Sequence, residues 1–319
     1  KTMAKILAND GISPSGVEAL ESNGYEVSTT NVAQEQLINH INDNQIDVLL
    51  VRSATTVRKD LIDACSSLKI IGRGGVGMDN IDVDYARDKG LHVINTPAAS
   101  SSSVAELVFA HLYGGVRYLF DANRQMPLEG DTKFKVLKKN YAGGSELRGK
   151  TMGIIGFGRI GQETAKIALG VGMNVIAHDP FMEKAALKVA LGNDVTVDYS
   201  IPMASFETVI RDADFISLHV PAQDKPVIGK KEFAMMKKGA GLINAARGGV
   251  IDEEALLDAL DSGQLSFAGL DTFVNEPKPA MKVLMHPNVS LTPHIGAATK
   301  EAQDRIGTEL AQQIHAILG

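Results

Sequence analysis

Residues 152–180 read MGIIGFGRIGQETAKIALGVGMNVIAHDP. An apolar run that predicts a strand comes first, and a glycine-rich turn and an amphipathic helix follow it. A second predicted strand, Val175–Ala177, leads directly to an acidic residue, Asp179. This order of elements predicts one β-α-β unit of a parallel sheet whose faces are covered by helices.

The three glycines of this unit have separate tasks in a site for a dinucleotide. Gly156 allows the tight turn, Gly158 lets the backbone approach a pyrophosphate, and Gly161 lets the helix pack on the strand. The free N–H groups at the start of that helix then face the phosphates. The Asp179 carboxylate can accept from both ribose hydroxyls of NAD and would repel a 2′-phosphate, and no Arg or Lys occupies residues 180–182. The pattern therefore predicts NAD as the cofactor.

Bulk composition limits the class of protein. The 319 residues suit two domains, and 44% hydrophobic with 22% charged residues is typical of a globular protein. The net charge of −6 argues against nucleic acid as a partner, and no apolar run approaches the roughly 18 residues of a membrane span. Cys65 is the single cysteine, so no intrachain disulfide can form, and the amino terminus lacks a signal-peptide pattern. We expect a cytoplasmic protein.

Short apolar runs alternate with amphipathic stretches along the chain, which predicts α/β domains with parallel sheets. Ser100–Asp121 is predicted to be one long helix that leads out of the first domain, and residues 126–150, which lack a clear period, are predicted to be a surface excursion. After Asp179 short apolar runs again alternate with amphipathic stretches, and Val195–Val197 is among the runs expected to fill out a doubly wound sheet. Lys300–Leu318 is predicted to be the final helix.

Three further segments stand at the ends of predicted strands, where an open α/β sheet has its ligand crevice. They carry Arg247, Glu276 and His294. Each has an ordinary explanation by itself, as a surface charge, a turn acid and a loop histidine. Together, an arginine, a carboxylate and an imidazole beside a nicotinamide are a working set for hydride transfer. The other histidines show no ligand-like spacing, so we expect no metal and interpret them as loop, strand-end or surface residues: His40, His92, His111, His178, His219, His286 and His315.

In order and spacing, these segments resemble the D-isomer-specific 2-hydroxyacid dehydrogenases along nearly the whole chain. The similarity includes VRSAT at 51–55, GRGGVGMDNID at 72–82, NTP at 95–97 and SVAE at 103–106. The resemblance implies an α/β fold of two doubly wound parallel-sheet domains that close over the ligand. They would be a flavodoxin-like substrate-binding domain from residues 1–97 plus 292–319 and a Rossmann NAD-binding domain from residues 98–291. It also implies a short form, without the regulatory domain that longer members append.

The same resemblance assigns roles to individual residues. His294 would take the proton of the substrate's 2-hydroxyl as hydride leaves C2, Glu276 would orient the imidazole and favour its protonated form, and Arg247 would clamp the substrate carboxylate. Further NAD contacts are implied at Arg159, Ile160, Val220, Pro221, Ala245, Ala246, Asp271 and Gly296. Further substrate contacts are implied at Arg52, Ser53, Arg73, Gly74, Gly75 and Val76, the last three through a nest of backbone N–H groups.

Several reactions fit these assignments. The leading hypothesis is NAD-dependent oxidation of 3-phospho-D-glycerate to 3-phosphohydroxypyruvate in serine biosynthesis, because Arg52 and Arg73 suit a phosphate dianion. A glycerate, hydroxypyruvate or glyoxylate reductase of the same family and an NAD-sensing protein-binding module are the alternatives. From the resemblance we expect a homodimer or a dimer of dimers, formed through the helix around residues 104–120 and the excursion after it. Lys138 or Lys139 could then reach a neighbouring subunit's site.

Overall fold

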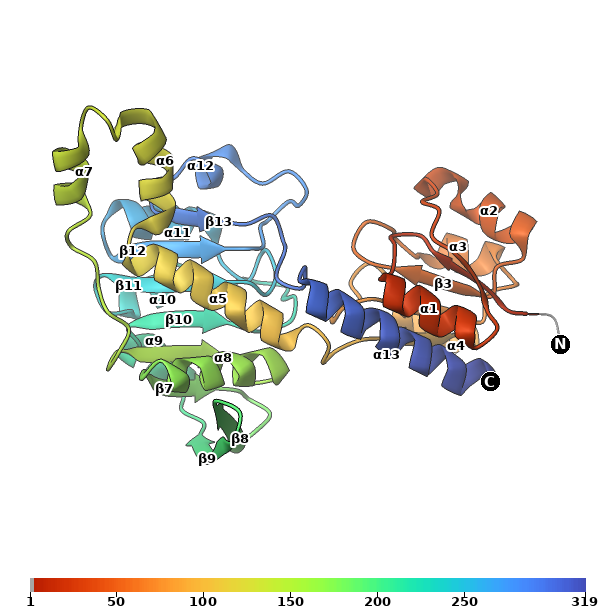
Figure 1. Cartoon of the computed structure of the whole chain (residues 1–319). Coiled ribbons are helices and arrows are strands. Elements are labelled where there is room, and N and C mark those ends of the chain that lie inside the picture. Colours follow the sequence, from red (N-terminus) through yellow and green to blue (C-terminus); the bar gives the residue numbers. More distant parts are fainter. Residues whose placement is uncertain (1–2) are drawn as a thin grey trace. The chain divides into compact units, whose positions relative to one another are not determined.

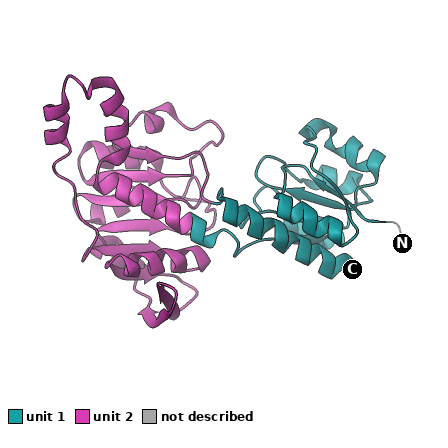
Figure 2. Ribbon diagram, in the orientation of Figure 1, with its two compact units in different colours: residues 1–103, 297–319 teal, residues 104–296 magenta. Residues whose placement is uncertain are grey.

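Each part of the chain is built around a parallel sheet whose strands bury side chains on both faces. The computed structural model describes residues 3–319, so residues 1 and 2 of the expected 1–97 segment lie outside the described residues. The chain divides into two units, shown in Figure 2. Unit 1 extends to Ser103 and resumes over Ala297–Gly319, and unit 2 is Val104–Gly296. The role of unit 1 in binding substrate stays a prediction.

The sheet of unit 1 has five parallel strands in the order β2-β1-β3-β4-β5, which is the predicted flavodoxin-like order. Its strands are β1 (Lys5–Ala8), β2 (Glu26–Ser28), β3 (Val48–Val51), β4 (Ile70–Arg73) and β5 (His92–Asn95). Its helices are α1 (Pro14–Ser22), the short 3-10 turn η1 (Gln34–Gln36), α2 (Leu37–Asn44), α3 (Lys59–Ala64), α4 (Val83–Asp88) and α13 (Lys300–Leu318).

Successive side chains of these strands enter two different cores, because their directions alternate along a strand. Ile6 of β1 packs on one face with Leu20 of α1 and Ile314 of α13. Its neighbour Leu7 packs on the other face with Ile41 of α2. The last helix of the chain therefore completes the core of the amino-terminal sheet.

The sheet of unit 2 has six parallel strands in the order β13-β12-β11-β10-β6-β7. These strands are β6 (Thr151–Ile155), β7 (Asn174–His178), β10 (Phe215–Leu218), β11 (Ala240–Asn244), β12 (Leu265–Leu270) and β13 (Val289–Leu291). The chain goes from β6 to β7 on one side and then returns to β10 on the other. The sheet is therefore doubly wound, as predicted, with its switch point beside β6.

Helices cover both faces of this sheet. On one face lie α5 (Ser101–Val116) and α8 (Arg159–Gly170), as Figure 1 shows. They pack over buried side chains such as Ile154. On the other face, α9 (Phe206–Asp212), α10 (Lys230–Met235) and α11 (Glu253–Asp261) pack over side chains such as Ile216. The short α12 (Met281–Leu284) precedes β13. The strands are buried on both faces, which explains their continuous apolar runs.

One predicted strand is not part of the six-stranded sheet. Val195–Val197 lies in β9 (Val195–Pro202), which pairs antiparallel with β8 (Lys184–Leu191) in a separate two-stranded sheet. Alternate residues of β8, such as Leu187, are buried, whereas most of β9 is exposed. Such a ribbon has only one face to bury, so it cannot enter a sheet that is covered on both faces. The prediction that this run fills out the main sheet is wrong.

The predicted helix over Ser100–Asp121 is also interrupted. Tyr118 adopts a left-handed backbone with φ of 55°, which ends α5 and separates it from α6 (Leu119–Glu129). The region 126–150, predicted as an irregular excursion, contains the end of α6 and all of α7 (Phe134–Asn140). Among the helices of residues 3–319, none is both long enough and apolar enough to cross a membrane.

Candidate active site

The glycine-rich turn after β6 has the geometry that its spacing predicts. Gly156 has φ of 87°, and a Cβ there would collide with the carbonyl oxygen of His219. A Cβ on Gly161 would collide with the carbonyl oxygen of Gly156. At Gly158 a Cβ would meet nothing within 4 Å, and no side chain caps the start of α8 there. Gly156 and Gly161 therefore allow close packing, whereas Gly158 leaves uncapped N–H groups and open space for an anion.

Asp179 has a second task that sequence reasoning missed. Its Oδ2 accepts a hydrogen bond from the backbone N–H of Phe157 at 2.8 Å, and its Oδ1 accepts from Phe181 N–H at 2.9 Å. The bond from Phe157 therefore fastens the glycine turn to the end of β7. The G-x-G pattern contains no signal for the contact between Phe157 and Asp179, because these two residues meet only when β6 and β7 pair in register.

His294 and Glu276, which are 18 positions apart, form a direct hydrogen bond. His294 Nδ1 lies 2.8 Å from Glu276 Oε2, and Glu276 Oε1 accepts from the backbone N–H of Phe273 at 2.9 Å. An ionised carboxylate only accepts, so Nδ1 carries the proton and a neutral imidazole presents Nε2 as its basic atom. His294 itself has a left-handed backbone with φ of 54°.

Arg247 follows β11 in a turn that Asn244 holds. Asn244 Nδ2 donates to Arg247 O at 2.8 Å, and Asn244 Oδ1 accepts from Ala246 N–H at 3.0 Å. Sequence reasoning did not single out Asn244, although a buried Asn at a strand end is a signal of this kind. Arg247, Glu276 and His294 line one cavity of about 280 Å³. The structure therefore brings the three predicted catalytic residues together.

The imidazole of His294 also lines a second, mainly apolar cavity. Its volume is about 400 Å³, and its walls include Phe273, Pro277, Leu284 and Leu291. The Glu276–His294 pair borders these apolar side chains and is also open to solvent, because the His294 side chain is 43% exposed and that of Glu276 34%.

The remaining cofactor candidates lie after the carboxyl ends of the strands. Val220 and Pro221 follow β10, Ala245 and Ala246 follow β11, and Asp271 follows β12. Val220 is packed beside the glycine turn, since a Cβ on Gly156 would lie 3.2 Å from its Cγ1. Gly296 donates its N–H to Asp271 Oδ2 at 2.9 Å. Arg159 and Ile160 open α8. All of them belong to unit 2.

The substrate candidates belong to unit 1 and lie at the ends of two paired strands. Val51 of β3 pairs with Arg73 of β4, so Arg52, Ser53 and residues 73–76 come from adjacent strand ends. The expected nest of three N–H groups is not formed. Gly74 N–H donates to Val51 O at 3.0 Å, and Gly75 N–H donates to Thr96 Oγ1 at 2.9 Å. Both amides are needed to hold the loop, which removes them from an anion site.

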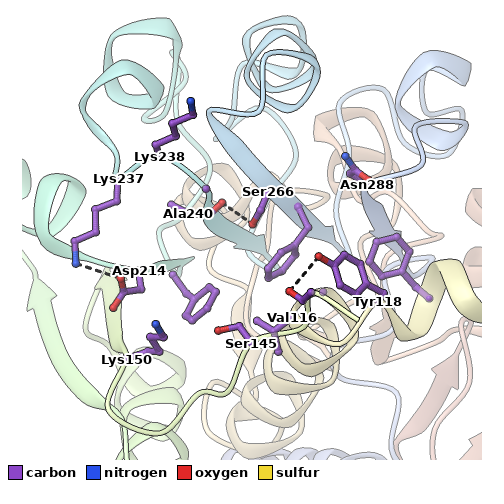
Figure 3. A pocket seen from close by; sticks show the side chains of 16 residues that line it. Val116, Tyr118, Ser145, Lys150, Asp214, Lys237, Lys238, Ala240, Ser266 and Asn288 are labelled. Carbon is purple, nitrogen blue, oxygen red and sulfur yellow. Dashed lines mark hydrogen bonds and ion pairs between the residues drawn. The ribbon is translucent and has the colours of Figure 1, made fainter. Parts of the chain in front are cut away.

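A further cavity in unit 2, whose lining residues are drawn in Figure 3, lies at the amino-terminal ends of the strands. Its volume is about 360 Å³, and Lys150, Asp214 and Lys237 line it, with Lys237 Nζ 3.2 Å from Asp214 Oδ1. These residues precede β6, β10 and β11. Ligands of doubly wound sheets bind at the carboxyl ends of the strands, so the dinucleotide belongs at the other edge. None of the predicted site residues lines this cavity.

Comparison with known proteins defines the class. Residues 109–296 match the family model of the D-isomer specific 2-hydroxyacid dehydrogenase, NAD binding domain. The chain belongs to this family. The matched domain confirms NAD as the predicted cofactor.

Individual relatives carry several names. The chain is 42% identical over 318 residues to a D-3-phosphoglycerate dehydrogenase of Methanocaldococcus jannaschii, covering 99% of this chain and 58% of that protein. It is 42% identical over 321 residues to a hydroxypyruvate reductase of Thermotoga maritima, covering 99% and 98%. The crystal structure of a glyoxylate reductase from Paecilomyes thermophila superposes with a TM-score of 0.79 at 29% identity, covering 98% and 94%. The chain thus spans little more than half of the first relative.

We predict that Asp179→Ala raises the dissociation constant for NAD and narrows the preference for NAD over NADP. The substitution removes the acceptor for the ribose hydroxyls, the charge that repels a 2′-phosphate, and the hydrogen bond from Phe157 N–H that holds the glycine turn. Titration of both cofactors by calorimetry measures the effect. Asp198→Ala is the matched control, since Asp198 is an exposed acid of β9 paired with Lys188. An unchanged ratio of the two affinities would contradict the role of Asp179.

Proposed function

We propose that the protein is an NAD-dependent dehydrogenase that oxidises 3-phospho-D-glycerate to 3-phosphohydroxypyruvate. The observation that carries the dehydrogenase reaction is the 2.8 Å hydrogen bond between His294 and Glu276 in a cavity that Arg247 also lines. Such a set can hold a carboxylate and move one proton at a carbon that loses hydride. This proposal rests on unit 2 for the chemistry and on unit 1 for substrate choice.

In this mechanism His294 is the general base. Its Nε2 takes the proton of the 2-hydroxyl, and the resulting imidazolium is stabilised by the Glu276 carboxylate at Nδ1. NAD, when bound, supplies the acceptor for the hydride from C2. Arg247 holds the carboxylate of the substrate and draws electron density from the developing carbonyl, a task that suits its planar set of donors. The reverse reduction uses the same groups, with His294 returning the proton.

Two observations support a phosphorylated substrate. Curated relatives from Methanocaldococcus jannaschii and Bacillus subtilis, 42% and 41% identical, are named D-3-phosphoglycerate dehydrogenase. Arg52 and Arg73 stand at adjacent strand ends, where two cations suit a phosphate dianion. Reduction of hydroxypyruvate is the second candidate, because the chain covers 98% of the Thermotoga maritima relative that bears that name. An NAD-sensing binding module without turnover is the third.

Exposed apolar side chains on α6 and α7 favour self-association. Leu128 is 74% exposed and Phe134 is 58% exposed, and Leu119, Met126 and Val136 of the same helices are exposed as well. An apolar cluster of this kind on a globular surface is typical of a subunit interface. We therefore include a homodimer, or a dimer of dimers, in the proposal. Contact of Lys138 or Lys139 of α7 with a neighbouring subunit's site, and a cytoplasmic location, are further parts of it.

We expect His294→Ala to reduce turnover at least ~10²-fold, the lower range for loss of a general base, and to change NAD affinity much less. Glu276→Gln should reduce turnover less and shift the pH–rate profile, because the imidazole remains but loses its neighbouring charge. Steady-state assays at 340 nm and calorimetry with NAD measure both. His286→Ala is the matched control, since His286 also bonds a carboxylate, Asp261, at 3.1 Å. Near-normal turnover of His294→Ala would refute the assignment.

Substrate choice is tested by Arg52→Ala and Arg73→Ala. If these arginines bind phosphate, each substitution should raise the KM for 3-phosphoglycerate roughly ten- to a hundred-fold, the range for a hydrogen bond to a charged group. Turnover of glycerate, hydroxypyruvate and glyoxylate should change little. Arg58→Ala, which removes an exposed arginine paired with Asp82, serves as control. Assays share one ionic strength, because salt screens exposed charges. Equal losses on all substrates would leave only a general 2-hydroxyacid dehydrogenase.

The interface is tested by the double substitution Leu128→Asp and Phe134→Asp. Two charges in an apolar interface should convert the oligomer to monomer in sedimentation velocity, because each carboxylate would have to be desolvated. Met285→Asp changes a 72% exposed methionine elsewhere in unit 2 and should leave the oligomer intact. A monomeric wild type, or an oligomer that survives the double substitution, would exclude this surface as the interface.

A further inference from the structure

His111 is a buried imidazole in α5, only 3% exposed, and not the loop, strand-end or surface residue that the sequence suggests. Its Nδ1 lies 2.8 Å from Ser290 Oγ, and its Nε2 lies 2.9 Å from Thr292 Oγ1. Ser290 is in β13, and Thr292 directly follows that strand. One side chain of α5 therefore bonds two hydroxyls at the segment that leads to His294.

The hydrogen bonds continue from Thr292 to a buried acid. Thr292 Oγ1 donates to Asp271 Oδ1 at 2.7 Å, and Asp271 is 1% exposed. The same carboxylate accepts the N–H of Ile295 at 2.8 Å and that of Gly296 at 2.9 Å. His294 N–H donates to Thr292 O at 3.1 Å. The residues on both sides of His294 are thus attached to one carboxylate.

The donors and acceptors of this chain of hydrogen bonds permit only one direction. The Asp271 side chain accepts from Thr292 Oγ1 and from two backbone amides, so the single hydroxyl proton of Thr292 is committed to it. Thr292 Oγ1 must then accept from His111, which places the imidazole proton on Nε2. A neutral His111 accepts at Nδ1, and Ser290 donates there. Burial lowers the pKa of His111, which keeps the imidazole in this neutral form.

The packing around His111 is specific to this arrangement. A Cβ on Gly269 of β12 would lie 2.6 Å from His111 Cβ, so a larger residue at that position would push α5 away from the sheet. The glycine allows the imidazole to reach the hydroxyl of Ser290 in β13 and that of Thr292 directly after it. A polar ring in an apolar core is costly unless both nitrogens are bonded, and here both are. An apolar side chain at position 111 would fill the space and leave Thr292 without a donor.

We propose that His111 is a positioning residue for His294, acting through the directed hydrogen bonds Ser290–His111–Thr292–Asp271. These bonds fix the Thr292 hydroxyl on Asp271, and Asp271 fixes the two amides that follow His294. The left-handed backbone of His294, with φ of 54°, is unfavourable for a residue with a Cβ and needs such an attachment. The consequence for turnover rests on the proposed function, whereas the geometry does not.

The decisive measurement is the tautomer of His111 together with amide exchange in the full chain without cofactor. ¹⁵N-histidine NMR, with the His111 signal assigned from His111→Gln, should show the proton on Nε2 at neutral pH. Thr292→Val and Ser290→Ala each remove one hydroxyl. Thr292→Val should speed exchange of the Ile295 and Gly296 amides at least ~10-fold, as expected for loss of a hydrogen bond to a charged group. Ser290→Ala should speed it less, since the bond to Asp271 remains.

Matched variants separate positioning from packing. Ser266→Ala removes a hydroxyl of β12 that bonds Ala240 O at 3.1 Å and should leave both amides unchanged. His111→Leu keeps volume without polarity and should lower kcat roughly ten- to a hundred-fold with little change in KM, since catalysis is sensitive to small displacements of the base. His111→Gln, which retains a donor and an acceptor, should recover part of that loss.

Either of two NMR results would overturn the proposal: a proton on Nδ1 of His111, or exchange of Ile295 and Gly296 in Thr292→Val equal to that of the wild type. Equal kcat in His111→Leu and the wild type would also do so, provided that the wild type turns over. If the protein oxidises no 2-hydroxy acid, the proposed function fails, while the tautomer and the exchange rates still decide whether the hydrogen bonds hold this loop. The two failures are therefore distinguishable.

Discussion

The common direction of the strands in unit 2 is the constraint on which the candidate site depends. Because β6, β7, β10, β11, β12 and β13 are all parallel, every loop that follows a strand emerges at the same edge. Asp179, Arg247 and Asp271 are distant in sequence and are brought to that edge by the ladder alone. One antiparallel strand in the middle would send its loop to the edge that Figure 3 shows, where the lysine-lined cavity lies. The strand topology therefore determines which residues lie together at this edge, whatever their individual chemistry.

Loops gathered at one edge still need fixed conformations, and this chain holds them with acidic side chains bonded to backbone amides. Asp179 accepts from Phe157 N–H, and Asp271 accepts from two amides after His294. Glu276 accepts from Phe273 N–H. A carboxylate is suited to this task because each oxygen can accept more than one bond and the bonds are charge-assisted. These carboxylates hold the loops in place, so we expect substitution of any of them to lower the local stability of its loop.

Local patterns predicted the features that depend on neighbouring residues, and failed for those that depend on distant ones. Spacing alone indicates the task of Gly161, because a Cβ there would collide with the carbonyl oxygen of Gly156 in the same turn. The β8–β9 ribbon was missed because a short apolar run has the same appearance in a central strand and in a one-faced hairpin. The amides of Gly74 and Gly75 were misjudged because their acceptors, Val51 O and Thr96 Oγ1, come from neighbouring segments that only the fold places there.

The pairing of Glu276 with His294 shows why an acid is required where an amide would have nearly the same shape. Glu276 Oε1 accepts from a backbone N–H while Oε2 accepts from Nδ1 of the imidazole, so both oxygens must be acceptors. A glutamine has one acceptor and one donor. If its oxygen stays on Phe273 N–H, its NH₂ group faces Nδ1, which must then lose its proton, and the imidazole carries it on Nε2 instead. The basic atom would then point at Glu276's position rather than at a substrate hydroxyl. With the amide turned round, two donors would face each other at Phe273. Only a carboxylate accepts from the backbone N–H and at the same time leaves Nε2 of the imidazole as its basic atom.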